Sequence, residues 1–474
     1  MNNVNVATGD AADTVSIGNT TNIRGSLGLS LGNGDNTVDL STLLVERDLT
    51  IDGRAGIDSV TVTDVDVNGN VNLALGDNNN IVNVSGLDVV KNISVRAGIG
   101  ADNVMFATTT SHGQIGLNVG DGANTVVFTT VAADRDLNID TGRGLDRLTL
   151  TSLTSHGNVN LRTNDGIDNL TLGSVIADRS LSIDTGRDGD SLCLTTTTAG
   201  NLSIRLGDGI NTLTATGTQV FGNFRLDGGR DGDNVTLNGL TALNADIRLA
   251  DGINGLALDT TNVLKTLTID TGRNADSVAL TTTTAGNIST RLGDGGNTLT
   301  ATDTTVFDGF RVEAGRDIDN VTLNNFAAAM VDLRLNDGAD ILNIDGLYKN
   351  SLKDHINVNI DVGNGDDVIG IQNIAAATGQ IRLGQGTNSL SVSDADSFNA
   401  LIYGGNAVDT INVSNSNFLS VLALLYGGND VVNLDTVQIV DKVTLDGSAG
   451  VNTLTQSSVT LPALLSNIHI SNFV

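Results

Sequence analysis

The chain has no tryptophan, one proline and one cysteine, and only 3% of its 474 residues are aromatic. A single cysteine excludes an internal disulfide, so cysteine content does not indicate whether the protein resides in an oxidising or a reducing compartment. Lys and Arg number 25 against 54 Asp and Glu, a formal charge of −29, and no basic stripe exists for nucleic acid to bind. No apolar run is long enough to cross a bilayer. The 39% of hydrophobic residues can still build a core, which we expect to be long and thin.

Glycine is abundant, with 56 residues, and it is periodic, which excludes a disordered low-complexity chain. Each copy of the motif has a glycine turn followed by an Asp or Asn, here called the anchor. An aliphatic residue stands two positions after the anchor, as in 206–213. The motif recurs 21 times at spacings of 21 to 23 residues, with one gap of 27. This periodicity predicts a solenoid. The anchors are residues 13, 36, 58, 80, 102, 124, 146, 168, 190, 211, 233, 254, 276, 297, 319, 340, 367, 388, 409, 430 and 452.

Aliphatic residues fall at fixed offsets from the anchor. Two residues after it stands Val, Leu or Ile in every copy, and the positions four after and nine, seven and five before are mostly apolar. Offsets that differ by two place side chains on one face of a strand. We therefore predict an all-β chain, with two short strands per coil, that forms a single parallel β-helix over 1–456 and a C-terminal cap segment over 457–474. At about 4.8 Å per coil, the rod would be on the order of 100 Å long.

Charges alternate in sign in two outward columns over about 115–345, three and six residues before the anchor, in opposite phase. A slip by one coil would stack like charges, so we expect this checkerboard to set register more than stability. The anchors are expected in the same outward ladder, where arginines balance the charge of the Asp anchors. Asn in place of Asp in alternate coils would halve the total charge of the column of anchors. The ladder residues three before the anchor are Arg143, Asp165, Arg187, Asp208, Arg230, Asp251, Arg273, Asp294 and Arg316.

Two regions depart from the regular pattern. One is a loop excursion over 345–355. In the other, the C-terminal coils carry large apolar residues where Arg and Asp stand in the middle of the chain. These side chains should form an exposed patch that needs covering, either by the tail, which leaves the coil period, or by a second copy of the protein. The predicted interface residues are Leu401, Tyr403, Leu422 and Leu424.

The stretches 404–411 and 363–369 resemble the glycine- and aspartate-rich nonapeptides of hemolysin-type (RTX) secreted proteins. That resemblance implies calcium between the turns, here near Asp367, Asp409 and Asp430. The chain departs from the family pattern, with one motif per coil and an Arg in every second turn of the regular part, where it competes with a divalent ion. The pattern is also similar to the β-helical shafts of bacterial adhesins and surface proteins, which implies an extracellular structural role.

Catalysis finds little support in the sequence. The four histidines are far apart, and Cys193 is expected as an exposed lone thiol. We therefore expect a non-enzymatic extracellular or surface rod without a cofactor, which associates with itself or contacts the cell surface or carbohydrate. No charged and apolar leader precedes the first coil, so this location assumes a mature form, a fragment or another export signal. The alternatives are a calcium-binding RTX-like protein and an ice- or carbohydrate-binding β-helix. Rows such as Thr212, Thr214 and Thr216 favour the last, but Met105 and Val127 interrupt the threonine column.

Overall fold

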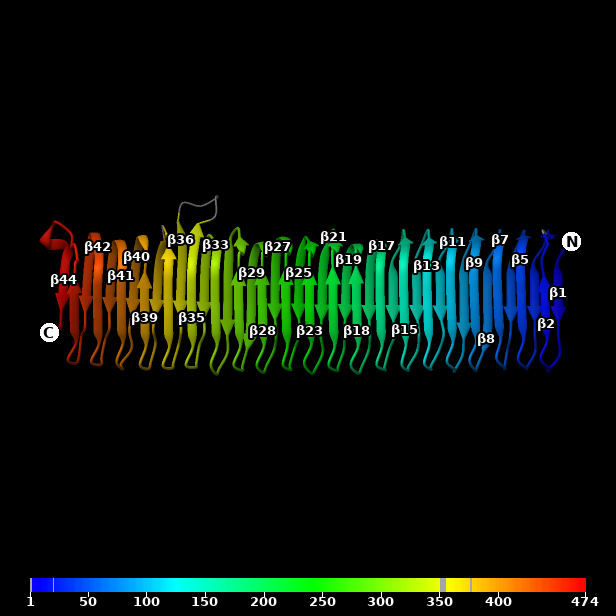
Figure 1. Ribbon diagram of the computed structural model, residues 1–474, viewed down its shortest axis with the longest axis horizontal. Helices are drawn as coiled ribbons and strands as arrows, with labels where there is room; N and C mark the ends of the chain where they lie inside the picture. Colours follow the sequence, from blue (N-terminus) through cyan, green and yellow to red (C-terminus); the bar gives the residue numbers. More distant parts are fainter. Residues whose placement is uncertain (1, 20, 350–354, 376) are drawn as a thin grey trace. The chain divides into compact units, whose positions relative to one another are not determined.

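The computed structural model describes residues 2–19, 21–349, 355–375 and 377–474 (Figure 1). The chain is an all-β parallel solenoid of about 21 turns, as predicted. Contacts divide it into two compact units, each described here by itself. The first holds 1–234 and 240–242, and the second holds 235–239 and 243–474. Among the described residues, no helix is long and apolar enough to cross a membrane.

Consecutive coils pair in register at the spacing of the repeat. In the first unit, β5 (Thr37–Val45) pairs with β7 (Ser59–Val67), and β6 (Leu49–Asp52) pairs with β8 (Val71–Gly76), each 22 residues along the chain. In the second unit, β33 (Asn320–Ala328) pairs with β35 (Ile341–Lys349). All these pairings are parallel. The sequence period is therefore one turn of the solenoid, and each coil repeats the hydrogen bonds of the last.

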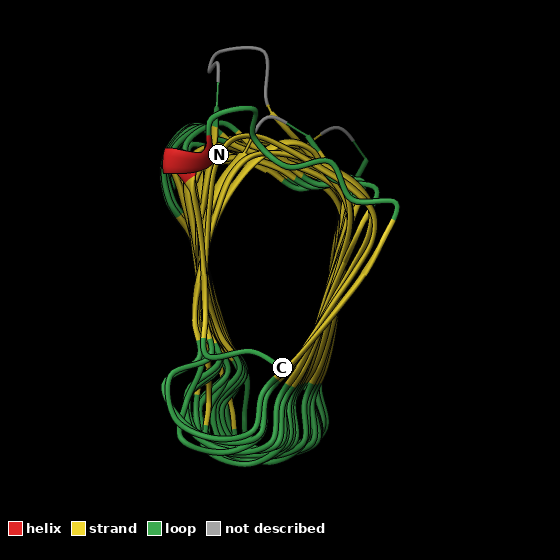
Figure 2. Ribbon diagram, turned by 90° about the vertical axis from the view of Figure 1, so that its left-hand side faces the viewer, coloured by secondary structure: helices red, strands yellow, loops and turns green. Residues whose placement is uncertain are grey.

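Each coil has a third strand segment that was not predicted. Six residues after the anchor, every coil has a residue with φ between 47° and 75°, and the chain bends there, as at Thr42 (φ 52°) and Ser152 (φ 55°). The first strand of the coil continues past this corner, so strands lie on three sides of the coil and the glycine turn closes it (Figure 2). Left-handed backbone is costly for a β-branched residue, so threonine at this position gave no turn signal in the sequence.

The core contains the inward columns that the offsets predicted and further columns past the corner. Within one coil, Val38 and Leu40 occupy predicted columns, Leu43 and Val45 lie past the corner, and all four are buried. Each such side chain stabilises the fold by about 1.5–3 kcal/mol relative to an exposed one. Phenylalanines pair between neighbouring coils, as Phe106 does with Phe128 at a ring-centroid distance of 5.1 Å. The core thus grows by one layer per coil.

The predicted loop excursion over 345–355 is shorter than expected. Residues 345–349 belong to β35, where Gly346 is the corner and Leu347 is buried. Residues 350–354 lie outside the described part of the chain. After them, β36 (Ile356–Asp361) pairs in register with β34 (Met330–Arg334). The register of the coils is therefore regained at β36 after the 27-residue gap.

The C-terminal segment over 457–474, predicted as a cap, ends the solenoid as one more coil and does not fold back over the outward apolar residues. After β43 (Thr453–Ser457) and a short 3-10 helix η1 (Leu465–Asn467), β44 (Ile468–Ser471) pairs in parallel with β42 (Val431–Asp446). The tail therefore completes the last coil. The last coil is three residues longer than the usual 22, since Val443 is paired with Ile468. Because of this extra length, the tail did not match the repeat period in the sequence.

Candidate functional site

The anchors form a buried column, here called the anchor column. From Asn36 to Asn452, each anchor side chain is at most 2% exposed. This corrects the prediction that the anchors stand in the outward charge ladder. The cause is local: the side chain turns back under the glycine turn of its own coil, where Asn211 donates to the carbonyl oxygens of Gly207 and Gly209 at 3.2 and 2.9 Å.

One oxygen of each anchor links neighbouring coils. Oδ1 of Asp168 accepts the backbone N–H of Asp146 in the preceding coil at 2.8 Å, and Oδ1 of Asp190 accepts that of Asp168 at 2.8 Å. The second unit repeats the bond, since Oδ1 of Asp276 accepts the N–H of Asn254 at 2.8 Å. All these bonds run in the same direction along the chain. They satisfy a buried N–H that lies just before the strand ladder begins.

The other anchor atom faces backbone carbonyls. Nδ2 of Asn124 lies 2.9, 3.2 and 2.7 Å from the carbonyl oxygens of Gly120, Gly122 and Thr141. Nδ2 of Asn254 lies 3.0, 3.1 and 2.9 Å from those of Ala250, Gly252 and Thr271. An amide suits this place because it donates hydrogen bonds and carries no charge.

Where the anchor is Asp, the atom in this place is Oδ2, which cannot donate unless it is protonated. In several coils Oδ2 is buried and has no hydrogen-bond partner among the described residues. Burial raises the pKa of the Asp319 and Asp367 carboxyls to about 7, and those of Asp340 and Asp430 to about 6. The anchors with such an oxygen include Asp58, Asp102, Asp319, Asp340, Asp367 and Asp430.

A second position changes together with the anchor. Five residues before Asn stands a large aliphatic in seven of the eight buried Asn coils, as Leu206 stands before Asn211. Five before Asp stands Gly, Ala or Thr in nine of twelve coils. At Gly53, an added Cβ would lie 2.0 Å from Oδ2 of Asp58, and Thr141 donates its hydroxyl to Oδ2 of Asp146 at 2.7 Å. The correlation between the anchor type and the residue five before it is visible in the sequence. It is the signal, missed in the sequence analysis, that Asp and Asn anchors have different surroundings.

The charge ladder three before the anchor lies at the surface of the glycine turns. Arg187 is bridged in register to Asp165 and to Asp208. Arg187 lies 3.7 Å from Asp165, Arg230 lies 3.5 Å from Asp208, and Arg273 lies 4.0 Å from Asp251. Each arginine thus reaches the acid of the preceding coil. These side chains are largely exposed, so each pair contributes about 0–1 kcal/mol.

The column six before the anchor makes a second kind of pair that the sequence analysis missed. Arg225 binds Asp227 at 2.8 Å and Arg248 binds Asp246 at 3.1 Å, each two residues along the same strand. Between coils, Arg205 lies 3.9 Å from Asp184. Alternate residues of a strand share a face, so this pairing was available from the spacing alone.

His112 and His156 lie in a short ladder with acids of the next coil. Nδ1 of His112 lies 2.9 Å from Asp134, and Nδ1 of His156 lies 2.7 Å from Asp178. These hydrogen bonds raise the pKa of both imidazoles. Cys193, expected as an exposed thiol, is instead half-buried on the outward side of β18 (Ser191–Thr195).

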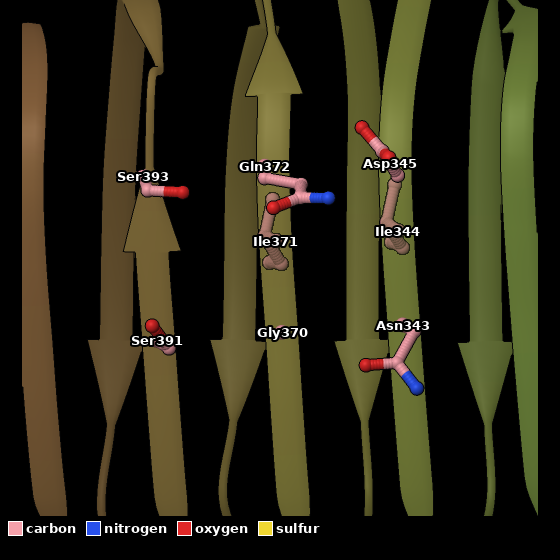
Figure 3. Close-up of a pocket in the computed structure, with 8 residues that line it drawn as sticks. All are labelled: Asn343, Ile344, Asp345, Gly370, Ile371, Gln372, Ser391 and Ser393. Carbon is pink, nitrogen blue, oxygen red and sulfur yellow. The ribbon is translucent and has the colours of Figure 1, made fainter.

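The first strand of each coil presents a nearly uncharged outer face. Thr212, Thr214 and Thr216 are exposed on it in β20 (Thr212–Thr216). In the second unit, Gly370 lacks a side chain and leaves a hollow of about 140 Å³ between β35, β37 (Val368–Ile374) and β39 (Ser389–Ser393) (Figure 3). Amide, hydroxyl and carboxylate groups surround this hollow: Asn343, Asp345, Gln372, Ser391 and Ser393.

The predicted apolar patch is half-buried. Leu401 stacks on Leu422 and Tyr403 stacks on Leu424, from β40 (Asp396–Tyr403) to β41 (Thr410–Leu424). The side chains cover one another between coils, which is why less apolar surface remains than the alternation suggested. The tail does not cover them, and Leu464 in the tail is itself 65% exposed.

The carboxylates near which calcium was predicted accept backbone hydrogen bonds. Oδ1 of Asp367 and of Asp430 accept a backbone N–H of the preceding coil at 2.8 and 2.9 Å, and Oδ2 of Asp409 accepts the N–H of Gly405 at 2.9 Å. Calcium takes six to eight oxygen ligands, several of them carboxylate. Within the described residues, no group of three or more His, Cys, Asp or Glu could hold a metal ion.

Comparisons with protein-family models, with curated proteins and with solved structures each gave no match, so the resemblances to RTX repeats and to adhesin shafts stay predictions.

Proposed function

We propose that the chain is a non-enzymatic structural module of the cell surface or extracellular space. The observation that carries the proposal is the use of its polar groups. Anchor amides and carboxyls bond from coil to coil, and arginines such as Arg187 and Arg248 pair with acids of the preceding coil or of their own strand. These polar side chains are thus engaged in bonds within and between coils.

The proposed location can be tested with an antibody raised against the chain. We expect it to label intact cells of the source organism as strongly as permeabilised ones. Labelling that appears only after permeabilisation would contradict a surface role. A structural module of this kind requires no active site, because its role depends on its length and its stability.

A second candidate function is the binding of a carbohydrate polymer by the uncharged face. The hollow at Gly370 favours it, since amide and hydroxyl groups can donate and accept hydrogen bonds with sugar hydroxyls. We expect the protein to sediment with an insoluble polysaccharide such as cellulose, chitin or peptidoglycan, and Gly370→Leu to reduce this binding by filling the hollow. Gly173→Leu is a matched control, because an added Cβ there meets no atom within 4 Å. Equal binding by both variants would exclude the hollow as the carbohydrate-binding site.

Self-association through Leu401, Tyr403, Leu422 and Leu424 belongs to the same proposal. These side chains are half-buried, so the area left to a second copy is modest. If they form an interface, Tyr403→Asp with Leu424→Asp should shift the protein toward monomer in analytical ultracentrifugation. An unchanged distribution of species would exclude these residues as an interface.

A further inference from the structure

Two turns of the solenoid are near copies that differ in the anchor. In the turn of Asn124, Val119 stands five before the anchor, and the two glycines have φ values of 74° and 148°. In the turn of Asp367, Val362 stands in the same place, and the two glycines have φ values of 89° and 153°. Both anchors are fully buried. The backbone therefore offers Asp367 the same surroundings that it offers Asn124.

In the Asn124 turn, three carbonyl oxygens face Nδ2. By position in the repeat, the corresponding carbonyls in the Asp367 turn belong to Gly363, Gly365 and Leu383. An ionised carboxylate oxygen against carbonyl oxygens is repelled by them, whereas a carboxylic acid O–H replaces the amide N–H as a donor. Protonation of Oδ2 of Asp367 explains why this buried oxygen has no hydrogen-bond donor beside it.

The groups around this anchor do not supply a compensating positive charge. Along the column, Asp340 lies in the preceding coil and Asn388 in the following one, and their bonds to Asp367 measure 2.8 and 3.1 Å. The neighbouring acids Asp366 and Asp340 both disfavour its ionisation. No described basic residue forms an ion pair with it, because the arginines of these coils lie outside the turn. In the two outward columns three and six before these anchors, the charged residues are Arg334, Asp337, Asp361 and Arg382.

Asp319, Asp340 and Asp367 are also consecutive in the column. Their N–H to Oδ1 bonds measure 2.7 and 2.8 Å, so the carboxyls are one coil apart, about 4.8 Å. Three buried negative charges at this spacing would repel one another strongly, because little solvent screens them. Asp146, Asp168 and Asp190 make the same run in the first unit.

We propose that the buried aspartates of the anchor column whose Oδ2 lacks a donor, such as Asp319, Asp340 and Asp367, are neutral carboxylic acids in the folded protein at pH values where an ordinary aspartate is ionised. Each is then a proton-binding site whose O–H donates to the carbonyls of its glycine turn. At these positions the acid is a neutral donor interchangeable with the amide of the Asn coils. Base, rather than acid, is the condition that opens the turns. The proposal does not depend on the surface role.

Protonation can be measured directly on the full chain. With aspartate labelled with ¹³C at the side-chain carboxyl, infrared spectroscopy should show the C=O stretch of protonated carboxylic acid at about pH 6, well above the range of an ordinary aspartate. The band should fade as pH is raised. Complete ionisation of all aspartates at about pH 5 would overturn the proposal, whether or not any variant folds.

Asp367→Asn isolates one site, and Asp361→Asn in the same coil is its matched control, since Asp361 lies outside the column. The titration of Asp367→Asn between about pH 5 and about pH 9 should release one proton fewer than the wild type, whereas Asp361→Asn should release the same number. The denaturant midpoint of Asp367→Asn should exceed that of the wild type at about pH 8 and should match it at about pH 5. A lower midpoint at both pH values would contradict a protonated anchor.

A cation in place of the proton is the rival explanation, and the same variants test it. Calcium, sodium and potassium are added to chelator-treated protein at constant pH near 8. The proposal expects no change in the midpoint beyond ordinary salt effects, which should be equal in wild type and Asp367→Asn. A midpoint that rises with one cation in the wild type, and not in Asp367→Asn, would overturn it.

Discussion

Thr141 lies between two successive anchors: its carbonyl oxygen accepts from Nδ2 of Asn124 at 2.7 Å, and its hydroxyl donates to Oδ2 of Asp146 at 2.7 Å. One buried residue thereby serves an amide on one side and a carboxyl on the other. It shows at a single position how the column combines two anchor types without leaving either oxygen of the acid unpaired.

Thr141→Val keeps the shape of this residue and removes its hydroxyl. The loss should cost about 1–3 kcal/mol, since Oδ2 of Asp146 stays buried without its donor. Urea unfolding at about pH 7 measures the change. Thr149→Val, on the outward face of β15 (Arg147–Ser155), should change stability by less than about 0.5 kcal/mol. Equal effects of the two substitutions would contradict the assigned bond.

The stability of the whole chain should fall as pH rises from about 4 to about 8. Burial raises the pKa of Asp146, Asp190 and Asp319 to about 7, above the value near 4 of an unfolded aspartate. The folded state therefore binds more protons in this window, and stability from this source is complete below about pH 4 and lost as pH passes 6 to 7. Thermal unfolding across this range measures it. Hydrogen bonds lower the pKa of Asp48 and Asp446, which act in the opposite sense in stronger acid.

The charge ladder can be reversed at one position. Arg187→Asp puts an acid between Asp165 and Asp208 and should cost about 1 kcal/mol at low salt, since like charges then stack in register. Adding Asp165→Arg and Asp208→Arg should recover most of this loss. Denaturant unfolding at two salt concentrations is the measurement, and a triple variant no more stable than the single one would show that the stacked charges do not interact.

Glycine five before an Asp anchor should be required for space. Gly53→Ala would place Cβ 2.0 Å from Oδ2 of Asp58 and should cost about 1–3 kcal/mol, because the buried carboxyl must move. Gly9→Ala is the control, since no atom lies within 4 Å of its added Cβ. Comparable melting temperatures for the two variants would contradict the packing described at Gly53.

The solenoid and its inward columns followed from the spacing of residues such as Val38 and Val60, because a period-two pattern repeated at fixed intervals admits few other folds. The anchors were misplaced, since an aspartate beside arginines was taken for a surface ion pair. Its burial depends on hydrogen bonds within the glycine turn, which composition does not reveal. The corner six after the anchor was missed because Thr, Ser, Asn, Asp and Gly share it, and only the backbone angle is common to them.

The one-way sense of the anchor bonds makes the two ends of each unit chemically different. In every linked pair, the N–H of the earlier coil points to the Oδ1 of the later coil, as from Asp409 to Asp430. The dipoles of these bonds add along the column instead of cancelling. An earlier coil thus offers an acceptor to whatever precedes it, and a later coil offers a donor to whatever follows. Any growth by addition of coils, whether in one chain or between chains, would be head to tail and open-ended rather than closed about a twofold axis.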